Sequence, residues 1–387
     1  MAGVIAQGCV RPAPVVSPRQ AMVALQRWDV VADDMDSASL EAACNKAIAW
    51  LEARPGKRLR FGPRVVGAGE LANALRWLRG VLVETPDPLE RTREIARRFV
   101  PMAAAGVGEV GRVLVTGYYE PVIEARKSAQ GEFVFPVYAV PRDLVFVDLG
   151  SFGGKGRAVG RLVGRRVVRY PSRCEIDFAR AIEGSADVLG YVRSLVDLFF
   201  LHIQGSGVLV FADGTRLRVG YAATNGHPYR SIGRLMLAQG WMSREEMSMQ
   251  GIRAFLAAHP ALMKKILCHN PSYVFFRPLP SAGGPVGCYG VELTPGRSIA
   301  TDRRLFPAMA PALLVGTIPS PGGGSRPFSR LVLNQDTGGA IKGPGRVDLF
   351  FGTGRAAGEL AGRMKHWARL VFLVPRGSQE ERVWLRR

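Results

Sequence analysis

The stretch LNQDTGGAIKGPGRVDLFFGTG, residues 333–354, places two aspartates on either side of a run rich in glycine. Its flanks, LVL at 331–333 and VDLFF at 347–351, have the apolar, β-branched and aromatic composition of strands. A carboxylate at the centre of VDLFF loses hydration, which raises its pKa and keeps part of it protonated near neutral pH. Such an acid can give a proton to a leaving oxygen, so Asp348 is the first candidate catalytic residue.

Asp336 opens the glycine-rich run DTGGAIKG. Glycines let a backbone approach a ligand closely and leave its N–H groups free for contact, which makes Asp336 a second candidate. The alternative is structural. Both aspartates could cap turns or pair with Lys342 and Arg346, as charged residues beside glycine-rich turns often do.

Outside this stretch, helical and β patterns come in blocks. Helical spacing is found at 36–52, 70–82, 88–100 and 229–267, with a capping box at Ser243–Glu246. Strand-like runs occupy 113–125, 133–140, 165–170 and 207–223, with a hairpin signal at Asp213-Gly214, and β character returns from 286 to 373. Residues 318–327 read as a flexible surface loop. The absence of regular βαβ alternation favours an α+β, mainly β chain with one or two small β-barrels.

The chain of 387 residues has a net charge of +20, which implies an anionic partner such as nucleic acid, a membrane surface or an acidic polymer. Residues 153–173 carry seven Lys or Arg and no acid, so they form either a solvated face or a groove for a polyanion. No nucleic-acid recognition motif accompanies them, and aromatic residues for base stacking are few. We therefore expect no nucleic-acid partner. No apolar run approaches the roughly 20 residues that would span a bilayer.

Five widely spaced cysteines include no CxxC pair, so we expect no zinc site. Their odd number argues against a full disulfide framework but leaves room for a single bridge. Residues 1–20 are expected to be a loose tail or the remnant of a leader, and 376–387 a second tail. Ala6-Gln7-Gly8-Cys9 resembles a lipoprotein cleavage box only poorly, so two readings stay open: a disordered tail, or an export signal lost from the recorded start.

Three other features of the sequence are better explained by structural roles than by catalysis or cofactor binding. FGTGRAA has the GxGxxA spacing at Gly352, Gly354 and Ala357, but no acidic residue follows at the distance that a dinucleotide site needs. The glycines are better explained by a tight strand-to-helix turn. The five histidines show no metal-ligand spacing. The serine of IQGSG, 203–207, lacks His and Asp partners, which favours a turn or a ligand-facing backbone over a nucleophile.

Aromatic residues gather with amides and hydroxyls in three places. TGYYEP contains Tyr118 and Tyr119, NGHPYRSIG contains Asn225 and Tyr229, and NPSYVFF contains Tyr273. A carbohydrate groove uses this combination, because apolar sugar faces stack on rings and sugar hydroxyls need hydrogen-bond partners. Several such clusters together with a candidate acid indicate a glycan-binding groove.

These motifs, with FLHIQGSG and above all QDTGGAIKGPGRVDLFFGTG, resemble the membrane-bound lytic murein transglycosylase A family, including its C-terminal three-aspartate (3D) domain. The resemblance runs in family order from about residue 110 to 375. It implies a double-psi β-barrel made from 21–120 and 279–375, a second β-domain inserted at 121–278, peripheral helices, and a glycan groove between the two domains.

The resemblance also implies cleavage of the β-1,4 bond between N-acetylmuramic acid and N-acetylglucosamine in peptidoglycan, with a 1,6-anhydromuramoyl end as product. Asp348 matches the catalytic aspartate, Asp336 the first aspartate of the motif, and Asp302 the third aspartate of the domain. No cofactor or metal is implied. From these motifs we expect the following substrate-binding residues: Thr116, Tyr118, Tyr119, Gln204, Ser206, Asn225, Tyr229, Tyr273, Asp302, Thr337 and Lys342.

The family is exported and implies a periplasmic or outer-membrane-anchored protein of a Gram-negative envelope. Its partners would be glycan strands, the outer membrane through a lipid anchor, and other cell-wall enzymes. Two alternatives stay open from the residues. One is a hydrolase of the same bond, and the other is a glycan-binding protein without activity.

Overall fold

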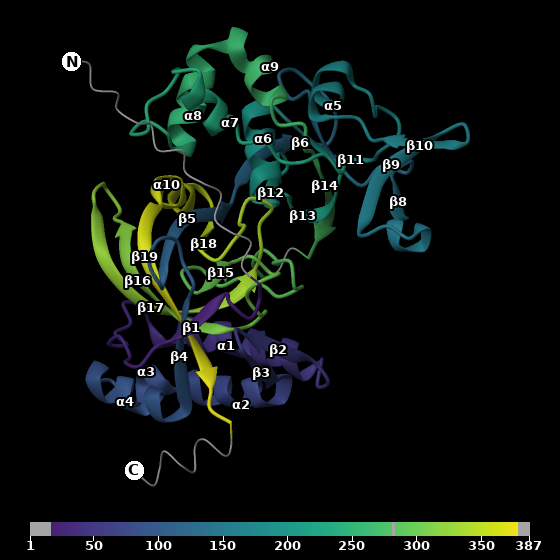
Figure 1. Cartoon of the computed structure of the whole chain (residues 1–387). Coiled ribbons are helices and arrows are strands. Elements are labelled where there is room, and N and C mark those ends of the chain that lie inside the picture. Colours follow the sequence, from purple (N-terminus) through teal and green to yellow (C-terminus); the bar gives the residue numbers. More distant parts are fainter. Residues whose placement is uncertain (1–16, 281–282, 378–387) are drawn as a thin grey trace, which may run out of the picture.

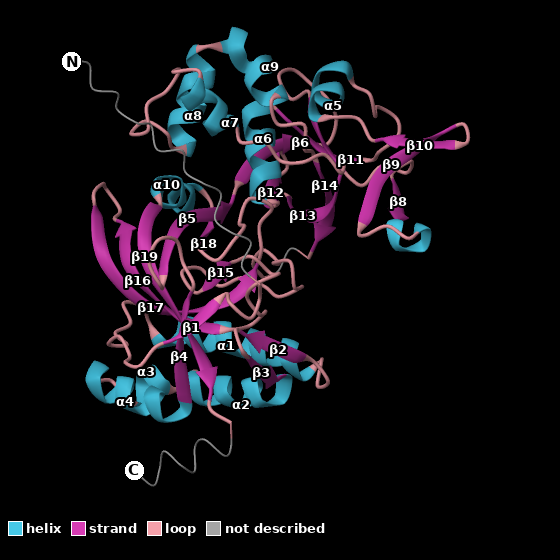
Figure 2. Cartoon of the chain, viewed as in Figure 1, coloured by secondary structure: helices cyan, strands magenta, loops and turns pink. Residues whose placement is uncertain are grey.

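The computed structural model of the chain describes residues 17–280 and 283–377. Two β-sheet bodies, one above the other in Figure 1, carry helices on their outer sides. Figure 2 shows how strands dominate both bodies. The predictions about Cys9, the N-terminal tail and the C-terminal tail fall wholly or largely outside the described residues.

The lower body is a closed β-barrel. Its sheet has the order β1-β4-β19-β16-β17-β15-β18-β5, and β5 also pairs with β19, which closes the six strands from β19 to β5 into a ring. Within the ring, β5 runs parallel to β18 and β15 parallel to β17, while the other pairs are antiparallel. The strands are β1 (Met22–Ala24), β4 (Phe99–Ala104), β5 (Arg112–Glu120), β15 (Ser298–Ala300), β16 (Pro311–Pro319), β17 (Ser325–Asp336), β18 (Arg346–Thr353) and β19 (Lys365–Pro375).

Side chains of the barrel strands alternate between the interior and the outer face. In β18, Val347 and Leu349 belong to the main hydrophobic core, so Asp348 between them points to the outer face. In β5, Val113 and Val115 enter the same core, and Thr116 faces outward. The outer face of these two strands therefore carries polar side chains on the side of the second body.

Helices cover the end of the barrel that lies away from the second body (Figure 1). Asp36 and Asp87 cap two of them by accepting the backbone N–H of Ser39 and Glu90, which satisfies donors that have no partner within the helix. The elements here are α1 (Ser37–Glu52), α2 (Ala68–Leu78), α3 (Val81–Glu84), α4 (Pro88–Arg98) and the hairpin of β2 (Arg58–Phe61) with β3 (Arg64–Gly67).

The upper body is a six-stranded sheet in the order β14-β13-β12-β6-β11-β7. A parallel bridge between Ala139 and Phe276 joins its two edges, so this sheet also curls into a small barrel. The predicted hairpin at Asp213-Gly214 is confirmed, with Gly214 at a φ of 79° between β12 and β13. The strands are β6 (Val122–Arg126), β7 (Phe135–Tyr138), β11 (Val188–Val192), β12 (Ser206–Phe211), β13 (Arg216–Thr224) and β14 (Val274–Leu279).

Helices pack on the upper sheet, and a disulfide between Cys174 and Cys268 ties two of them together. The predicted capping box of Ser243 and Glu246 forms its two hydrogen bonds, but it closes a single turn, because the next helix begins only at Met249. The helices are α5 (Arg173–Ala179), α6 (Leu195–Gln204), α7 (Ile232–Ala238), α8 (Met249–Ala258) and α9 (Pro260–Cys268).

A separate three-stranded sheet stands beside the upper body. It consists of β8 (Val145–Asp148), β9 (Arg157–Val163) and β10 (Arg166–Arg169), with the short 3₁₀ helix η1 (Leu149–Phe152) between β8 and β9. The basic run of the sequence therefore forms strands.

The prediction of an α+β, mainly β chain with two small barrels is confirmed. GxGxxA is a strand-to-helix turn, since Gly352 and Gly354 have φ of 112° and 90° immediately before α10 (Arg355–Arg363). The predicted loop at 318–327 is shorter than expected, because β16 and β17 extend into both of its ends and leave only 320–324 between them. The chain passes between the bodies at Pro121, from β5 into β6, and again after β14. We propose that the domain boundaries predicted at 121–278 lie at these passages.

Candidate active site

The two aspartates of the glycine-rich motif lie in one row across neighbouring barrel strands. Asp348 of β18 pairs with Thr116 of β5 on one side and with Ala300 of β15 on the other. Ala300 in turn pairs with Asp336 at the end of β17. One residue of β15 therefore separates the strand positions of the two acids in this row.

Asp348 is half-buried and has one hydrogen-bond donor, the hydroxyl of Thr116, at 2.7 Å from Oδ1. Arg346 Nη2 donates to the same hydroxyl oxygen at 3.1 Å and so directs its hydrogen toward the carboxylate. Desolvation raises the pKa of Asp348 to about 6, assisted by the charge of Asp336 and opposed by Thr116 and Arg346. Within the described part of the chain no hydrogen bond reaches Oδ2, so this oxygen is available to a ligand.

Asp336 is held differently. It accepts hydrogen bonds from the backbone N–H of Cys288 and of Thr337, both at 2.8 Å to Oδ1, and from the Tyr118 hydroxyl at 3.1 Å to Oδ2. Burial raises the pKa of Asp336, and these three donors act against that rise because they stabilise the carboxylate. Tyr118 packs against Phe350, with ring centroids 5.3 Å apart, which fixes its hydroxyl. Asp336 is therefore a positioned acceptor with little freedom to move.

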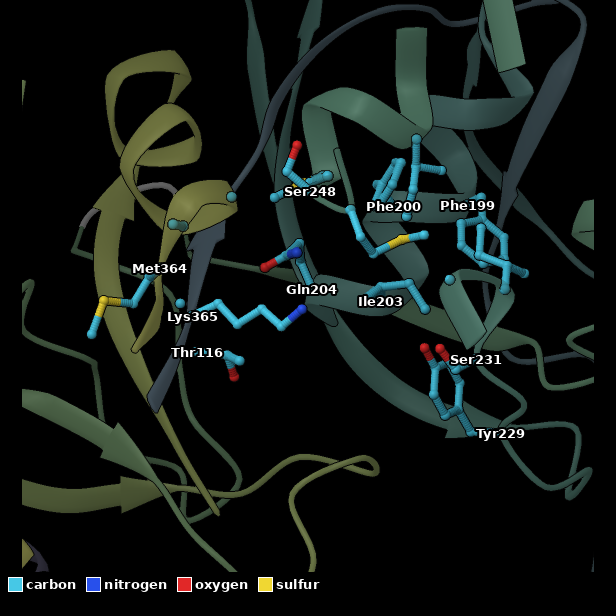
Figure 3. A pocket seen from close by; sticks show the side chains of 18 residues that line it. Thr116, Phe199, Phe200, Ile203, Gln204, Tyr229, Ser231, Ser248, Met364 and Lys365 are labelled. Atoms are coloured by element: carbon cyan, nitrogen blue, oxygen red, sulfur yellow. The ribbon is translucent and has the colours of Figure 1, made fainter. Parts of the chain in front are cut away.

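A cavity of about 300 Å³ lies beside Thr116, between the barrel and the upper body (Figure 3). From the barrel, Thr116 and Lys365 line it, and the Lys365 side chain extends into it (Figure 3). From the upper body come apolar and polar side chains. They include Phe199, Phe200, Ile203, Gln204, Tyr229, Ser231, Met247, Ser248 and Met249. Thr116 thus links the cavity to Asp348, which is not itself part of the cavity wall.

A second cavity, of about 270 Å³, continues past Tyr229. It is lined by Arg230, Arg234 and His269 of the upper body and by Ala340 of the glycine-rich motif. Tyr229 borders both cavities, so the groove between the bodies runs from Lys365 to the loop that follows Asp336. Apolar walls with a few polar groups suit a carbohydrate chain.

Two family models match the chain. The MltA specific insert domain covers residues 114–277, and the 3D domain covers 297–374. Membrane-bound lytic murein transglycosylase A of Escherichia coli K12 is 38% identical over 273 residues, or 69% of this chain and 67% of that protein. The Vibrio cholerae protein of the same name is 34% identical over 296 residues, or 75% and 73% of the two chains. The chain belongs to the membrane-bound lytic murein transglycosylase A family.

Solved structures of MltA family proteins match the fold of this chain. A membrane-bound lytic murein transglycosylase from Agrobacterium tumefaciens matches with a TM-score of 0.73 at 34% identity, covering 88% of this chain and 93% of that one. Escherichia coli MltA with bound chitohexaose matches with a TM-score of 0.73 at 30% identity, covering 93% and 96%.

In this MltA family member, several predicted substrate-binding residues lie at the groove or beside the acids. Thr116, Gln204 and Tyr229 line it, and Tyr118 contacts Asp336. The Thr337 hydroxyl donates to the Thr301 carbonyl at 2.8 Å, so it ties the motif to the barrel. Lys342 is exposed in the glycine-rich loop, and Ser206, at the start of β12, is partly buried.

Other predicted site residues support the fold. Tyr119 turns away from the acids, packs against α10, and its backbone N–H donates to Gln204 Oε1 at 3.0 Å. The Asn225 amide bonds to backbone groups: it donates to the carbonyls of Pro171 and Pro271 and accepts from the N–H of Tyr273 and His227. Tyr273 itself is fully buried. Neither Asn225 nor Tyr273 lines either of the two cavities described above, and both are buried within the upper body.

Asp302 also has a structural position. Arg304 binds both of its carboxylate oxygens, and the N–H of Gly343 donates to Oδ2 at 2.8 Å. These donors hold the pKa of Asp302 down at about 2 although burial acts in the opposite direction. The carboxylate thus anchors the glycine-rich loop and has no oxygen left for a sugar.

No sequence pattern indicated Lys365, the apolar wall at Ile203 and Met247, or the backbone donor of Cys288. They lie far in sequence from the motifs that they meet: Lys365 pairs with Thr116 across β19 and β5, and Cys288 donates to Asp336. Over residues 17–280 and 283–377, no three His, Cys, Asp or Glu side chains gather in a way that could hold a metal ion.

Proposed function

We propose that this chain cleaves the β-1,4 bond between N-acetylmuramic acid and N-acetylglucosamine of peptidoglycan, with Asp348 as its one acid and base. The observation that carries the proposal is the position of Asp348. It is a half-buried carboxyl group with a pKa raised to about 6 and one unoccupied oxygen, beside a groove between two bodies. Membership of the MltA family supports the same reaction.

In the first step, protonated Asp348 donates its proton to the glycosidic oxygen, and the bond from that oxygen to C1 of the muramic acid breaks. A pKa of about 6 leaves a useful fraction of the acid protonated near neutral pH. Thr116 holds Oδ1, which leaves Oδ2 to carry the proton. The positive charge that develops on the sugar lies close to two carboxylates, Asp348 and Asp336.

In the second step, the Asp348 carboxylate takes the proton of the sugar's own C6 hydroxyl. The C6 oxygen then forms a bond to C1, which gives the 1,6-anhydro end and returns Asp348 to its protonated form. The attacking hydroxyl belongs to the reacting sugar, so its effective concentration is far above that of an external nucleophile. This mechanism requires no second catalytic carboxylate. It agrees with the hydrogen bonds of Asp336, whose two oxygens already accept from Tyr118, Cys288 and Thr337.

Replacing Asp348 tests the assignment. Asp348→Asn keeps the size and the contact with Thr116 but cannot exchange the proton, so turnover of purified sacculi should fall roughly 10³-fold or more. Binding of glycan chains should persist. The control is Asp213→Asn, at an exposed hairpin turn that lines neither cavity, which should leave turnover unchanged. Near wild-type turnover in Asp348→Asn would show that another group is the acid.

Mass spectrometry of the products separates this reaction from its alternatives. An anhydro end is lighter by one water than the reducing end that a hydrolase leaves. If all new ends are reducing ends, the protein is a hydrolase. If the glycan stays intact at every pH, the protein binds glycan without cleaving it.

We also propose that the protein acts in the envelope of a Gram-negative bacterium, where its substrate is found, in the periplasm or anchored at the outer membrane. The Cys174–Cys268 disulfide supports an oxidising compartment. None of the helices in the described residues has the length and apolar character needed to cross a bilayer. A lipid anchor and contacts with other cell-wall enzymes remain part of the proposal, which fractionation of the native host would test.

A further inference from the structure

The basic run has no place in the proposed reaction. Between Asp148 and Glu175 the chain contains seven Lys or Arg residues and no Asp or Glu. The structure folds most of this run into the hairpin of β9 and β10, which projects from the side of the upper body (Figure 1). Among the described strands, β10 pairs with β9 alone. The hairpin therefore presents its end to whatever lies outside the molecule.

The end of the hairpin, residues 161–169, exposes at least one apolar side chain on each face. Leu162, Val163 and Val167 are 61%, 53% and 51% exposed. Leu162 pairs with Val167, so these two side chains share one face, while Val163 pairs with Arg166 on the other. Large apolar side chains exposed together on a soluble protein mark an interaction site more often than chance exposure does.

Arginines flank the apolar end. Arg165, Arg166 and Arg169 are exposed, and within the described chain none of them forms an ion pair. Their positive charge is therefore not neutralised by the protein. Arginine side chains have long apolar stems, which lets their charged groups sit at the level of phosphates while neighbouring apolar residues lie deeper.

We propose that the 161–169 hairpin end inserts into the surface of an anionic phospholipid bilayer. The deciding feature is that exposed apolar side chains lie on both faces of the ribbon, Leu162 and Val167 on one and Val163 on the other. A protein partner would cover one face of a two-stranded ribbon, whereas a lipid layer surrounds an inserted tip on all sides. A soluble polyanion would engage the arginines and leave Leu162, Val163 and Val167 in water. The combination of apolar residues and a basic rim matches the depth profile of a lipid headgroup region.

Co-sedimentation with vesicles tests this contact on the full 387-residue chain, carrying Cys9→Ser so that no acyl group attaches there. One set of vesicles contains phosphatidylethanolamine with phosphatidylglycerol, and the other contains phosphatidylcholine only. The chain should bind the anionic vesicles and should bind the neutral ones far less. Binding should weaken as salt rises from 0.05 to 0.5 M, because exposed charges are screened.

Two double variants separate the apolar and the charged parts. Leu162→Ser with Val167→Ser should weaken binding to anionic vesicles roughly tenfold, because two apolar side chains no longer enter the lipid. Arg165→Ser with Arg166→Ser should weaken it about 30-fold, since each arginine near an anionic surface adds about a factor of five to ten. The matched control, Arg58→Ser with Arg244→Ser, removes two exposed arginines elsewhere and should change binding by less than about twofold.

Turnover of soluble glycan fragments by all these variants should equal that of the parent, because the hairpin does not line the groove. The proposal fails if the Leu162→Ser, Val167→Ser variant binds vesicles as well as the parent. It also fails if the hairpin variants lose affinity for purified sacculi while keeping their affinity for vesicles, which would identify wall polymer as the occupant. The proposal also fails if the Arg58→Ser, Arg244→Ser control loses as much affinity for anionic vesicles as the arginine variant of the hairpin. Overall charge would then explain the binding.

Discussion

At the scale of single residues, the side chain of Asp348 connects sequence to chemistry most directly. Its place among apolar residues in VDLFF predicted a desolvated acid, and the structure gives it a pKa of about 6 for that reason. The same sequence reasoning could not separate groove residues from core residues. Asn225 and Tyr273 have the composition of a sugar site, yet both are buried within the upper body, because sequence gives the type of a side chain and not its direction.

Thr116 should control the pH dependence of the reaction. Its hydroxyl stabilises the Asp348 carboxylate and so lowers that pKa, which means that Thr116→Val should raise the pKa further above about 6. The acid must be protonated to act, so kcat/KM falls as pH rises through this pKa. In Thr116→Val the fall should move to higher pH by about one unit.

Thr116→Ser keeps the hydroxyl and is the matched control, with an expected profile close to that of the parent. The measurement is kcat/KM on soluble glycan fragments between pH 4 and 9. A profile that moves toward lower pH, or does not move at all, would contradict the assigned role of the hydroxyl.

At the scale of elements, periodicity and capping predicted much of the secondary structure. The helical spacing at 36–52 predicted α1, and Asp213-Gly214 predicted the turn between β12 and β13. The Ser243–Glu246 box shows the limit of such signals. Its hydrogen bonds form, but no apolar face continues the helix at once, so tertiary packing decides that α8 begins later.

The disulfide between α5 and α9 should contribute strongly to the stability of the upper body. It closes a loop with a sequence separation of 94, and chain-entropy arguments assign about 3–5 kcal/mol to such a link. Cys174→Ser with Cys268→Ser should lower the free energy of unfolding by that order, as measured by urea denaturation followed by circular dichroism.

Reductant provides the control for the disulfide. The parent chain should lose comparable stability in dithiothreitol, and the double variant should not respond to it. Equal stability of the parent with and without reductant would show that the disulfide does not contribute to the free energy of unfolding.

At the scale of the whole molecule, local sequence patterns predicted one or two small barrels but not how the chain closes them. Thr116 and Asp348 are hydrogen-bonded yet lie 232 positions apart in sequence, and no local signal reports such a pairing. The arrangement of a barrel with an insertion came from the resemblance of motifs in a fixed order. Composition and periodicity alone predicted helices and strands, but not the order in which the strands pair.

One buried ion pair joins the two bodies where the chain passes between them. Glu120 of β5 is fully buried and accepts from Arg218 of β13 at 2.9 Å and from Thr353 of β18 at 2.8 Å. Arg218→Leu would leave an uncompensated buried carboxylate, so it should lower the free energy of unfolding by about 3–5 kcal/mol. Thermal and urea unfolding of purified protein at pH 7.5 provide the measurement.

Two companion variants make this prediction specific. Arg355→Leu breaks an exposed pair with Glu359 on α10 and should cost no more than about 0.5 kcal/mol. Adding Glu120→Gln to Arg218→Leu removes the orphaned charge and should recover part of the loss. A loss below about 1 kcal/mol in Arg218→Leu alone would mean that water or movement of the bodies relieves the carboxylate.

The return of β5 onto β18 and β19 has a consequence for biosynthesis. Strands that belong to the beginning of the barrel are made long before their partners, because the upper body is synthesised between them. That body, including both cysteines of its bridge, is complete before β15 exists, so it can mature while β5 still has an unsatisfied edge. The nascent barrel strands are therefore exposed to aggregation for most of the time needed to make the chain, and a holding chaperone should associate with this early stage.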